Sequence, residues 1–206
     1  MCIRDRADKV EAITKMETPT SVTEVQRFLG MCNALSKFSP RMAELSEPLR
    51  QLTCKGVQWN WGPEHTESFE SLKREISTAP ILKYYDPTKP IVLQTDACIK
   101  GLGAVLLQEE HPIYFASKSL TDAQRNYVAI ELEALAVSWA VQKFHHYLYG
   151  ASFTLQTDQK PLQAILSKSF VEATPRMQRL LLPTIPYDMT VEYIKGSTNF
   201  IADCLS

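Results

Sequence analysis

The tetrapeptide Leu-Gln-Thr-Asp occurs twice in this 206-residue chain, at residues 93–96 and 155–158. Each copy ends a run that is rich in β-branched and apolar residues, IVLQTD in one case and SFTLQTD in the other, and such runs are typical of strands. The repeat therefore predicts Asp96 and Asp158 at the ends of two buried strands. Because a carboxylate there is unfavourable unless it is hydrogen-bonded, paired or bound to a cation, the fold must provide a use for both.

The bulk composition is that of a globular protein without a strongly charged arm. The formal net charge is −1, with 45% hydrophobic and 22% charged residues, which argues against nucleic-acid binding driven by charge alone. It leaves open an enzyme that a partner domain holds on a nucleic acid. No run approaches the roughly 18 apolar residues of a membrane span, so no membrane partner is expected.

The cysteines and histidines give no metal or disulfide pattern. The five cysteines are scattered without a C-x-x-C spacing, and there are four histidines, so a structural zinc site is not expected. Free thiols fit a reducing compartment, and we expect an intracellular protein that is not secreted.

The chain after residue 90 alternates between strand and helix patterns. Strands are predicted at 91–96, 101–108, 113–118, 152–158 and 189–194, and helices at 121–149, 160–166, 175–182 and from 199 onward. The short gaps between the first three strands favour antiparallel hairpins, and the later helices favour parallel crossovers. The prediction is an α/β fold with a five-stranded mixed sheet.

The chain before residue 90 is predicted to form a small, mainly helical subdomain. A capping box of Ser21 and Glu24 starts one helix, and further helices are expected at 41–52 and 63–77, with a short strand in VQWNW between them. The proline-containing segment 78–90 is predicted to be an extended connector.

The expected domains follow from these boundaries. MCIRDR is similar to a translated sequencing adapter, so residues 1–7 are set aside, and the chain is expected to be a fragment that is truncated at its C-terminus. The remaining segments are a helical one at 8–55, a linking strand, helix and connector at 56–90, and the α/β domain at 91–206.

Four acids have apolar or strand-end surroundings: Asp96, Glu133, Asp158 and Asp203. Each alone could be a strand-end cap or a hydrogen-bond anchor. Together they form a set of oxygen donors without His or Cys, which suits Mg²⁺ or Mn²⁺. Two such ions can support hydrolysis of a phosphodiester by an activated water.

Several blocks of the sequence resemble a known family. TDACIKGLGAVLLQ, the run from YFASK to HHYLYG, FTLQTDQKPL and YIKGSTNFIADCLS are similar to the ribonuclease H domain of gypsy-type (Metaviridae) LTR retrotransposon Pol polyproteins. The upstream segments SVTEVQRFLGMCNALSKF and WNWGPEHTESFESLKREI resemble the thumb and connection segment of their reverse transcriptase. The resemblance covers nearly everything from residue 8 to residue 206.

The resemblance implies a ribonuclease H-like fold that cleaves the RNA strand of an RNA–DNA hybrid with two Mg²⁺ ions, with Mn²⁺ as an alternative. It implies metal ligands at Asp96, Glu133, Asp158 and Asp203, and a reverse transcriptase polymerase domain upstream in the same polyprotein. It also implies neighbouring parallel first and fourth strands, and a location in a cytoplasmic virus-like particle or in the nucleus.

The long helix offers two glutamates, and the resemblance selects Glu133. The family's helical acid precedes an alanine in an apolar run, as in EALAV. Glu131 differs in helical phase by about 200°, so it is not expected to face the same neighbours.

Contacts to the hybrid are expected near these acids. A hybrid duplex is bound through phosphates and 2′-hydroxyl groups, and the candidate residues are Lys100, Lys118, Arg125, Asn126 and Tyr127. The alternative is a solvated face with one packed aromatic ring.

Two other functions remain open. An integrase or transposase uses the same fold, but its acids lie on the first strand, the fourth strand and a late helix, whereas Glu133 lies on the helix between those strands. The second alternative is a catalytically inactive, element-derived module for folding or tethering. Polymerase activity is not expected, because the chain contains no Asp-Asp pair.

Overall fold

The computed structural model describes residues 3–39, 41–78, 82–99, 101–168 and 173–195. The chain forms two compact units, Met1–Ile81 and Leu82–Ser206. The division falls within the segment that was expected to be a connector. No helix in the described part of the chain is both long and apolar enough to cross a membrane.

The first unit is helical. Its elements are α1 (Ile3–Thr14), α2 (Val22–Ala34), the 3-10 turn η1 (Ser36–Phe38), α3 (Met42–Gln51) and α4 (Pro63–Thr78). The hydroxyl of Ser21 accepts a hydrogen bond from the amide of Glu24, as the sequence predicted. The carboxylate of Glu24 instead accepts from the amide of Thr20 at 2.7 Å, so the reciprocal half of the capping box is displaced by one residue.

The core of this unit lies between α2, α3 and α4. The rings of Phe28 and Phe69 lie 4.5 Å apart, and Leu49 and Leu72 are fully buried beside other apolar side chains. The buried residues within each helix recur at helical spacing, as Val25, Phe28 and Cys32 do in α2, so each helix buries one face.

Helix α1 starts inside the segment that the sequence set aside. It begins at Ile3, within residues 1–7, which were set aside because they are similar to a translated adapter. The sequence IRDRADKVEAIT contains Arg, Ala, Lys and Glu, which are strong helix formers whatever their origin.

The prediction of a short strand between residues 55 and 62 is wrong, because the described residues there form no strand. An isolated strand would leave its backbone donors and acceptors without partners. The segment is held through a side chain instead: the indole of Trp61 donates to the hydroxyl of Thr66 at 2.9 Å. Val57 and Trp59 remain exposed.

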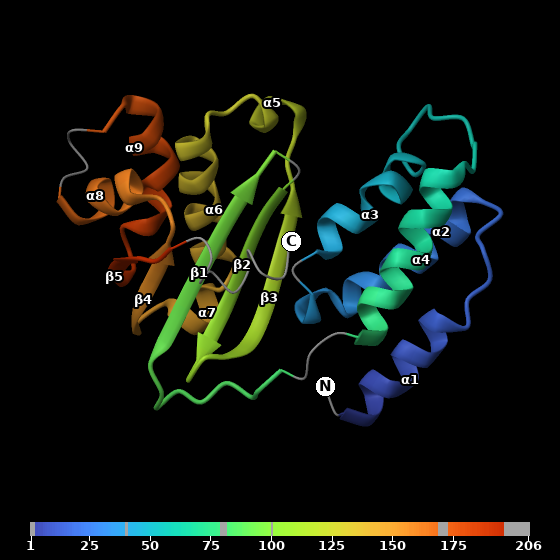
Figure 1. Cartoon of the computed structure of the whole chain (residues 1–206), viewed down its shortest axis with the longest axis horizontal. Helices are drawn as coiled ribbons and strands as arrows, with labels where there is room; N and C mark the ends of the chain where they lie inside the picture. Colours follow the sequence, from blue (N-terminus) through green and yellow to red (C-terminus); the bar gives the residue numbers. More distant parts are fainter. Residues whose placement is uncertain (1–2, 40, 79–81, 100, 169–172, 196–206) are drawn as a thin grey trace. The chain divides into compact units, whose positions relative to one another are not determined.

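The second unit is built on a five-stranded sheet. Its strands are β1 (Ile91–Cys98), β2 (Gly101–Gln108), β3 (His111–Ser119), β4 (Ser152–Thr157) and β5 (Asp188–Tyr193). Their order is β3-β2-β1-β4-β5. β1, β2 and β3 pair antiparallel, and β1–β4 and β4–β5 pair parallel (Figure 1). The predicted mixed sheet, its hairpins and the parallel pairing of the first and fourth strands are confirmed.

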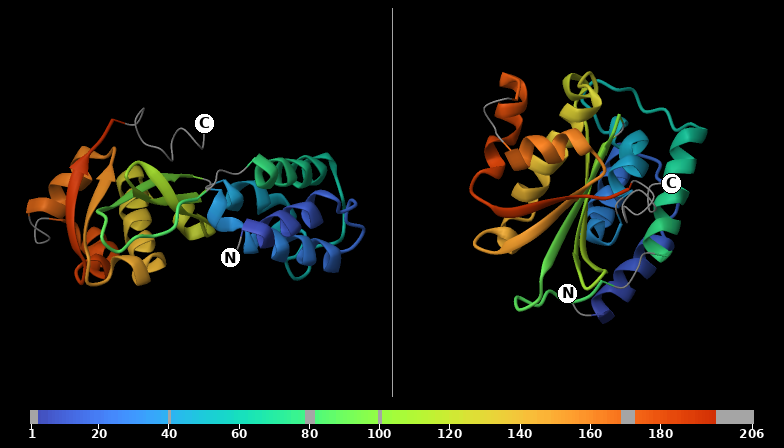
Figure 2. Two further views of the ribbon diagram at one scale, coloured as in Figure 1. Left: turned by 90° about the horizontal axis from the view of Figure 1, so that it is seen from below. Right: turned by 60° about the vertical axis from the view of Figure 1, so that its left-hand side comes forward.

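The helices of this unit surround that sheet. They are α5 (Asp122–Arg125), α6 (Ala129–Lys143), α7 (His145–Leu148), α8 (Lys160–Lys168), α9 (Pro175–Leu181) and the 3-10 turn η3 (Leu182–Thr184). The buried core joins Leu93 of β1 and Leu155 of β4 to Val137 and Phe144 at α6 and its end. Helices α8 and α9, in orange and red, lie on the side of β4 and β5 (Figure 2).

The prediction of a single helix at 121–149 is wrong, because the three helices α5, α6 and α7 occupy this range. Thr121 and Gln124 form the capping box that begins the short helix α5, and this helix ends at Arg125. Val128 then has an extended backbone with φ −71° and ψ 157°, and Phe144 separates α6 from α7. The helix that was predicted to be continuous is therefore interrupted at Val128 and again at Phe144.

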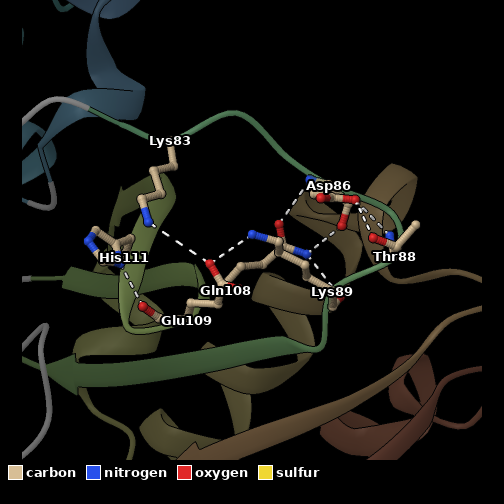
Figure 3. A network of polar contacts seen from close by, with 7 residues as sticks. All are labelled: Lys83, Asp86, Thr88, Lys89, Gln108, Glu109 and His111. Atoms are coloured by element: carbon tan, nitrogen blue, oxygen red, sulfur yellow. Dashed lines mark hydrogen bonds and ion pairs between the residues drawn. The ribbon is translucent and has the colours of Figure 1, made fainter.

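The connector is fixed to the tip of the β2–β3 hairpin by one buried side chain (Figure 3). The amide oxygen of Gln108 accepts from the backbone N–H of Asp86 at 3.0 Å. Its amide nitrogen donates to the carbonyls of Asp86 and Lys89 at 2.8 and 3.0 Å. Lys89 also pairs with Glu109 at 2.8 Å. The connector at residues 82–90 is thus held against the β2–β3 hairpin by these contacts.

The turn of this hairpin has an unusual backbone for its sequence. Glu109 and Glu110 have φ angles of 51° and 61°, and they connect the paired residues Gln108 and His111. Two-residue hairpin turns of this kind favour Asn-Gly, because positive φ is unfavourable for side chains with a Cβ.

Candidate active site

The two Leu-Gln-Thr-Asp segments pair with each other in register. On the parallel strands β1 and β4, Leu93 is level with Leu155 and Gln94 is level with Gln156. Both leucines are fully buried. Two residues further on, the same register places Asp96 level with Asp158, where β4 has ended. The fold therefore brings the two aspartates of the repeat to one end of the sheet.

Asp96 lies close enough to Asp158 to be affected by its charge. Burial raises the pKa of Asp96 above its ordinary value, and the charge of Asp158 raises it further. The backbone N–H of Ala97 lowers the pKa of Asp96 and is the weakest of the three influences. Asp96 therefore lies in a partly desolvated environment with a like charge nearby.

Glu133 on α6 completes a group of three carboxylates. Its side chain is buried, with 4% exposure, and burial is the main cause that raises its pKa to about 8. The charges of Asp96 and Asp158 add to this effect, and the N–H of Ala97 opposes it. Glu131, two residues earlier, faces Arg176 at 3.2 Å instead. The structure thus brings Glu133, and not Glu131, to the two aspartates.

The donor chemistry of this group fits a hard divalent cation. Glu133 Oε2 and Asp158 Oδ1 are buried and have no hydrogen-bond partner within the described residues, and carboxylate oxygens are the ligands that Mg²⁺ prefers. As the side chains stand, no three His, Cys, Asp or Glu residues in the described part of the chain form a closed metal-binding group. Asp203, the fourth predicted ligand, lies outside the described residues.

The residues predicted to contact substrate differ in their surroundings. Lys118 is exposed on β3 at the position paired with Leu102, and Arg125 is exposed at the end of α5. The side-chain amide of Asn126 donates to the carbonyl of Asp122 at 3.1 Å. Lys100 lies outside the described residues.

Tyr127 is engaged by the protein itself. It packs against a small apolar cluster that includes Leu102 and Leu132. The guanidinium of Arg176 lies 4.7 Å from the centre of its ring, a cation–π contact. The alternative of a packed aromatic therefore describes Tyr127 better than an open stacking surface does. Arg176 was not singled out in the sequence, because a lone arginine in a short helix carries no distinguishing pattern.

The glutamines of the repeat were also overlooked as site residues. Gln94 Nε2 donates to Gln156 Oε1 across β1 and β4 at 2.7 Å. Gln156 Nε2 in turn lies 3.4 Å from Glu192 Oε2 on β5. The signal was present, because identical glutamines at equivalent positions of two paired strands must lie side by side.

Known proteins have sequences similar to this chain. Residues 61–155 match the family described as the RNase H-like domain found in reverse transcriptase, a range that includes Asp96 and Glu133 and ends before Asp158. The retrovirus-related Pol polyprotein from transposon 297 of Drosophila melanogaster is 38% identical over 99% of this chain and 19% of its own length. The transposon Tf2-3 polyprotein of Schizosaccharomyces pombe is 31% identical over 97% of this chain and 16% of its own length.

Solved structures show the same fold. The foamy viral protease-reverse transcriptase in complex with dsDNA matches with a TM-score of 0.77 and 22% identity, over 91% of this chain and 41% of that one. Its complex with an RNA/DNA hybrid matches with a TM-score of 0.76 and 23% identity, over 91% and 27%. The chain spans about a fifth of the polyproteins that it matches. Residues 61–155 thus match the RNase H-like domain found in reverse transcriptase, and nearly the whole chain is similar to the corresponding section of LTR retrotransposon Pol polyproteins.

Proposed function

We propose that this section of the polyprotein hydrolyses the RNA strand of RNA–DNA hybrids during reverse transcription, with two Mg²⁺ ions as cofactors. Mn²⁺ has the same preference for oxygen ligands and could replace Mg²⁺. The observation that carries the proposal is the convergence of three carboxylates from separate parts of the fold: Asp96 and Asp158 are level with each other at one end of the sheet, and their charges raise the pKa of the buried Glu133.

In this proposal the carboxylates act as metal ligands. Asp96, Glu133 and Asp158 hold the ions through their oxygens, and Asp203 is the fourth ligand. Bound metal supplies a nucleophilic water and stabilises the leaving oxygen of an in-line displacement. The buried position of Glu133 limits the access of bulk water, so its negative charge is stabilised mainly by a cation at the site.

The proposed substrate is a hybrid duplex, because the matched family is RNase H-like and a related fold has been solved with an RNA/DNA hybrid. Lys118 and Arg125 are exposed, and both are proposed to contact phosphates. Lys100, which lies outside the described residues, is proposed to do the same. Asn126 is proposed to contact sugar hydroxyl groups. Tyr127 is assigned to the support of this surface through its contact with Arg176.

The proposed partner is the reverse transcriptase polymerase domain upstream in the same polyprotein. With a formal net charge of −1, the chain has little general attraction for nucleic acid, so the polymerase would hold it on the hybrid. The proposed setting is intracellular, in a cytoplasmic virus-like particle or in the nucleus.

The test is cleavage of a hybrid with labelled RNA by the purified chain in Mg²⁺. Asp96→Asn is expected to abolish cleavage, because it removes a charged ligand and leaves the shape of the side chain unchanged. Asp86→Asn is the matched control, because Asp86 precedes β1 and lies at the other end of that strand from Asp96. Full activity of Asp96→Asn would refute the metal assignment.

A second candidate is a catalytically inactive module for folding or tethering within the reverse transcriptase. The observation in its favour is that the described side chains do not form a closed metal-binding group as they stand. It predicts no cleavage and no effect of Mg²⁺ on the thermal unfolding of the wild type, including a form extended at the C-terminus with the residues that follow in its relatives.

A further inference from the structure

We propose that Gln94 and Gln156 are positioning residues that keep Asp96 and Asp158 level with each other. The inference rests on the proposed function, since it concerns the same metal site. It assigns no chemical step to the glutamines, which act through the strands that carry the aspartates.

The first argument is their position on the sheet. Side chains alternate between the two faces of a strand, so Gln94 shares a face with Asp96, and Gln156 shares a face with Asp158. Each glutamine precedes its aspartate by two residues, which is about 6.6 Å along a strand. The bond from Gln94 to Gln156 at 2.7 Å therefore joins the strands directly before the carboxylates.

The second argument is where the backbone pairing ends. The parallel ladder between β1 and β4 runs from the pair Ile91 and Phe153 to the pair Gln94 and Gln156. Asp96 and Asp158 lie beyond its last pair, so the ladder does not hold them together. The side-chain bond is thus at the last paired position before the site.

The third argument is electrostatic. Asp96 and Asp158 repel each other when both are charged, and this repulsion acts to separate the strand ends. The bond between the two amide side chains is part-buried, and Gln94 is 5% exposed, so water competes weakly for it. The bond therefore opposes the separation from the last position that the ladder pairs, directly before the two carboxylates.

A purely structural role for the bond makes a different prediction. Loss of a structural bond lowers the thermal unfolding midpoint by the same amount with and without Mg²⁺. Loss of a positioning bond also raises the Mg²⁺ concentration that produces half of the Mg²⁺-induced shift. The second quantity separates the two roles and does not depend on catalysis.

The experiment measures thermal unfolding of the whole chain during a titration with Mg²⁺. In Gln94→Leu the half-maximal Mg²⁺ concentration is expected to rise roughly tenfold, as for other residues that orient metal ligands. Gln156→Leu is the second variant and gives the same test at a less buried position. Gln108→Leu is the matched control, because this buried glutamine is hydrogen-bonded away from the site; it should lower the midpoint and leave the Mg²⁺ dependence unchanged.

The double variant of Gln94 and Gln156 tests whether the two act as a pair. Because either single change breaks the bond, the double change should shift the Mg²⁺ dependence no further than one of them. An unchanged Mg²⁺ dependence in both single variants would overturn the inference and leave the proposed function standing. No Mg²⁺ response in the wild type would overturn the proposed function, and the inference with it.

Discussion

Arg176 of α9 and Glu131 of α6 form an ion pair, with Nη1 of the arginine 3.2 Å from Oε2 of the glutamate. The same guanidinium covers the ring of Tyr127, so α9 is attached to the first turn of α6. Glu133 follows Glu131 by two residues but is buried, and the charges of the half-buried Asp96 and Asp158 act on it. Neighbouring glutamates on one helix thereby have separate roles, one in packing and one at the proposed site.

These separate roles predict opposite outcomes for two similar substitutions. Glu133→Gln should abolish Mg²⁺-dependent cleavage of a hybrid, because it removes a proposed ligand without changing the volume of the side chain. Glu131→Gln should retain cleavage and lower stability by no more than about 1 kcal/mol, since Arg176 is largely exposed. Both are measured by cleavage of a labelled hybrid and by urea unfolding. Retention of full activity in Glu133→Gln together with its loss in Glu131→Gln would show that the wrong glutamate has been assigned.

The carboxylates also predict how stability depends on pH without divalent cations. The pKa of Glu133 is raised from 4.5 to about 8, so between these values the native state binds more protons than the unfolded state. The free energy of unfolding therefore falls as pH rises through this window, by an amount on the order of a few kcal/mol. The raised pKa of Asp96 acts with the same sign.

The measurement is thermal unfolding in EDTA across this pH range, compared with Glu133→Gln. The variant lacks the titrating carboxyl group, so the difference in unfolding midpoint between the two proteins should change steadily from pH 4.5 to about 8. Profiles that stay parallel over this window would contradict the raised pKa.

Gly101, at the start of β2, allows the close approach of β3. A Cβ at this position would lie 2.8 Å from the backbone oxygen of Lys118. Gly101→Ala is therefore expected to destabilise the second unit by about 1–3 kcal/mol. Gly30→Ala is the matched control, because a Cβ on this residue of α2 would meet nothing within 4 Å; it should stabilise its helix by roughly 0.5–1 kcal/mol. Equal effects of the two changes in calorimetry would disprove the contact.

The hairpin turn gives a fourth prediction. Glu110→Gly should stabilise the second unit by about 1 kcal/mol, because glycine adopts a φ of 61° without steric conflict. Glu109→Gly relieves the same kind of strain but removes the ion pair with Lys89, so its net effect should be smaller. Hydrogen exchange of the β2 and β3 amides measures both changes, and a larger gain for Glu109→Gly would contradict the role of the ion pair.

Much of the sheet could be predicted from the sequence, because period-two patterns and short gaps specify strands and hairpins directly. The convergence of Asp96 and Asp158 followed from the family resemblance, which implied that the two strands with the same tetrapeptide are parallel neighbours. What could not be predicted depends on geometry between distant residues. The contact of Arg176 with Tyr127 joins α9 to the bend between α5 and α6, two segments with no sequence pattern in common.

The break in the expected long helix shows a different limit. The helical pattern of the later residues was extended back to residue 121, so one helix was predicted. The capping box of Thr121 and Gln124 starts a helix of a single turn, and the extended backbone of Val128 separates it from α6. Such choices depend on small local energies that a periodic pattern does not express.

The in-register repeat has a consequence for folding. A slip of one residue between β1 and β4 would turn one complete strand over and expose Leu155 while burying Gln156 and Asp158 in the apolar core. A slip of two residues would keep the faces but set an uncharged amide beside one aspartate and leave the other aspartate alone. Each misaligned register of these identical segments is thus destabilised for a different reason. The side chains of the two segments themselves therefore favour the correct alignment of this parallel pair.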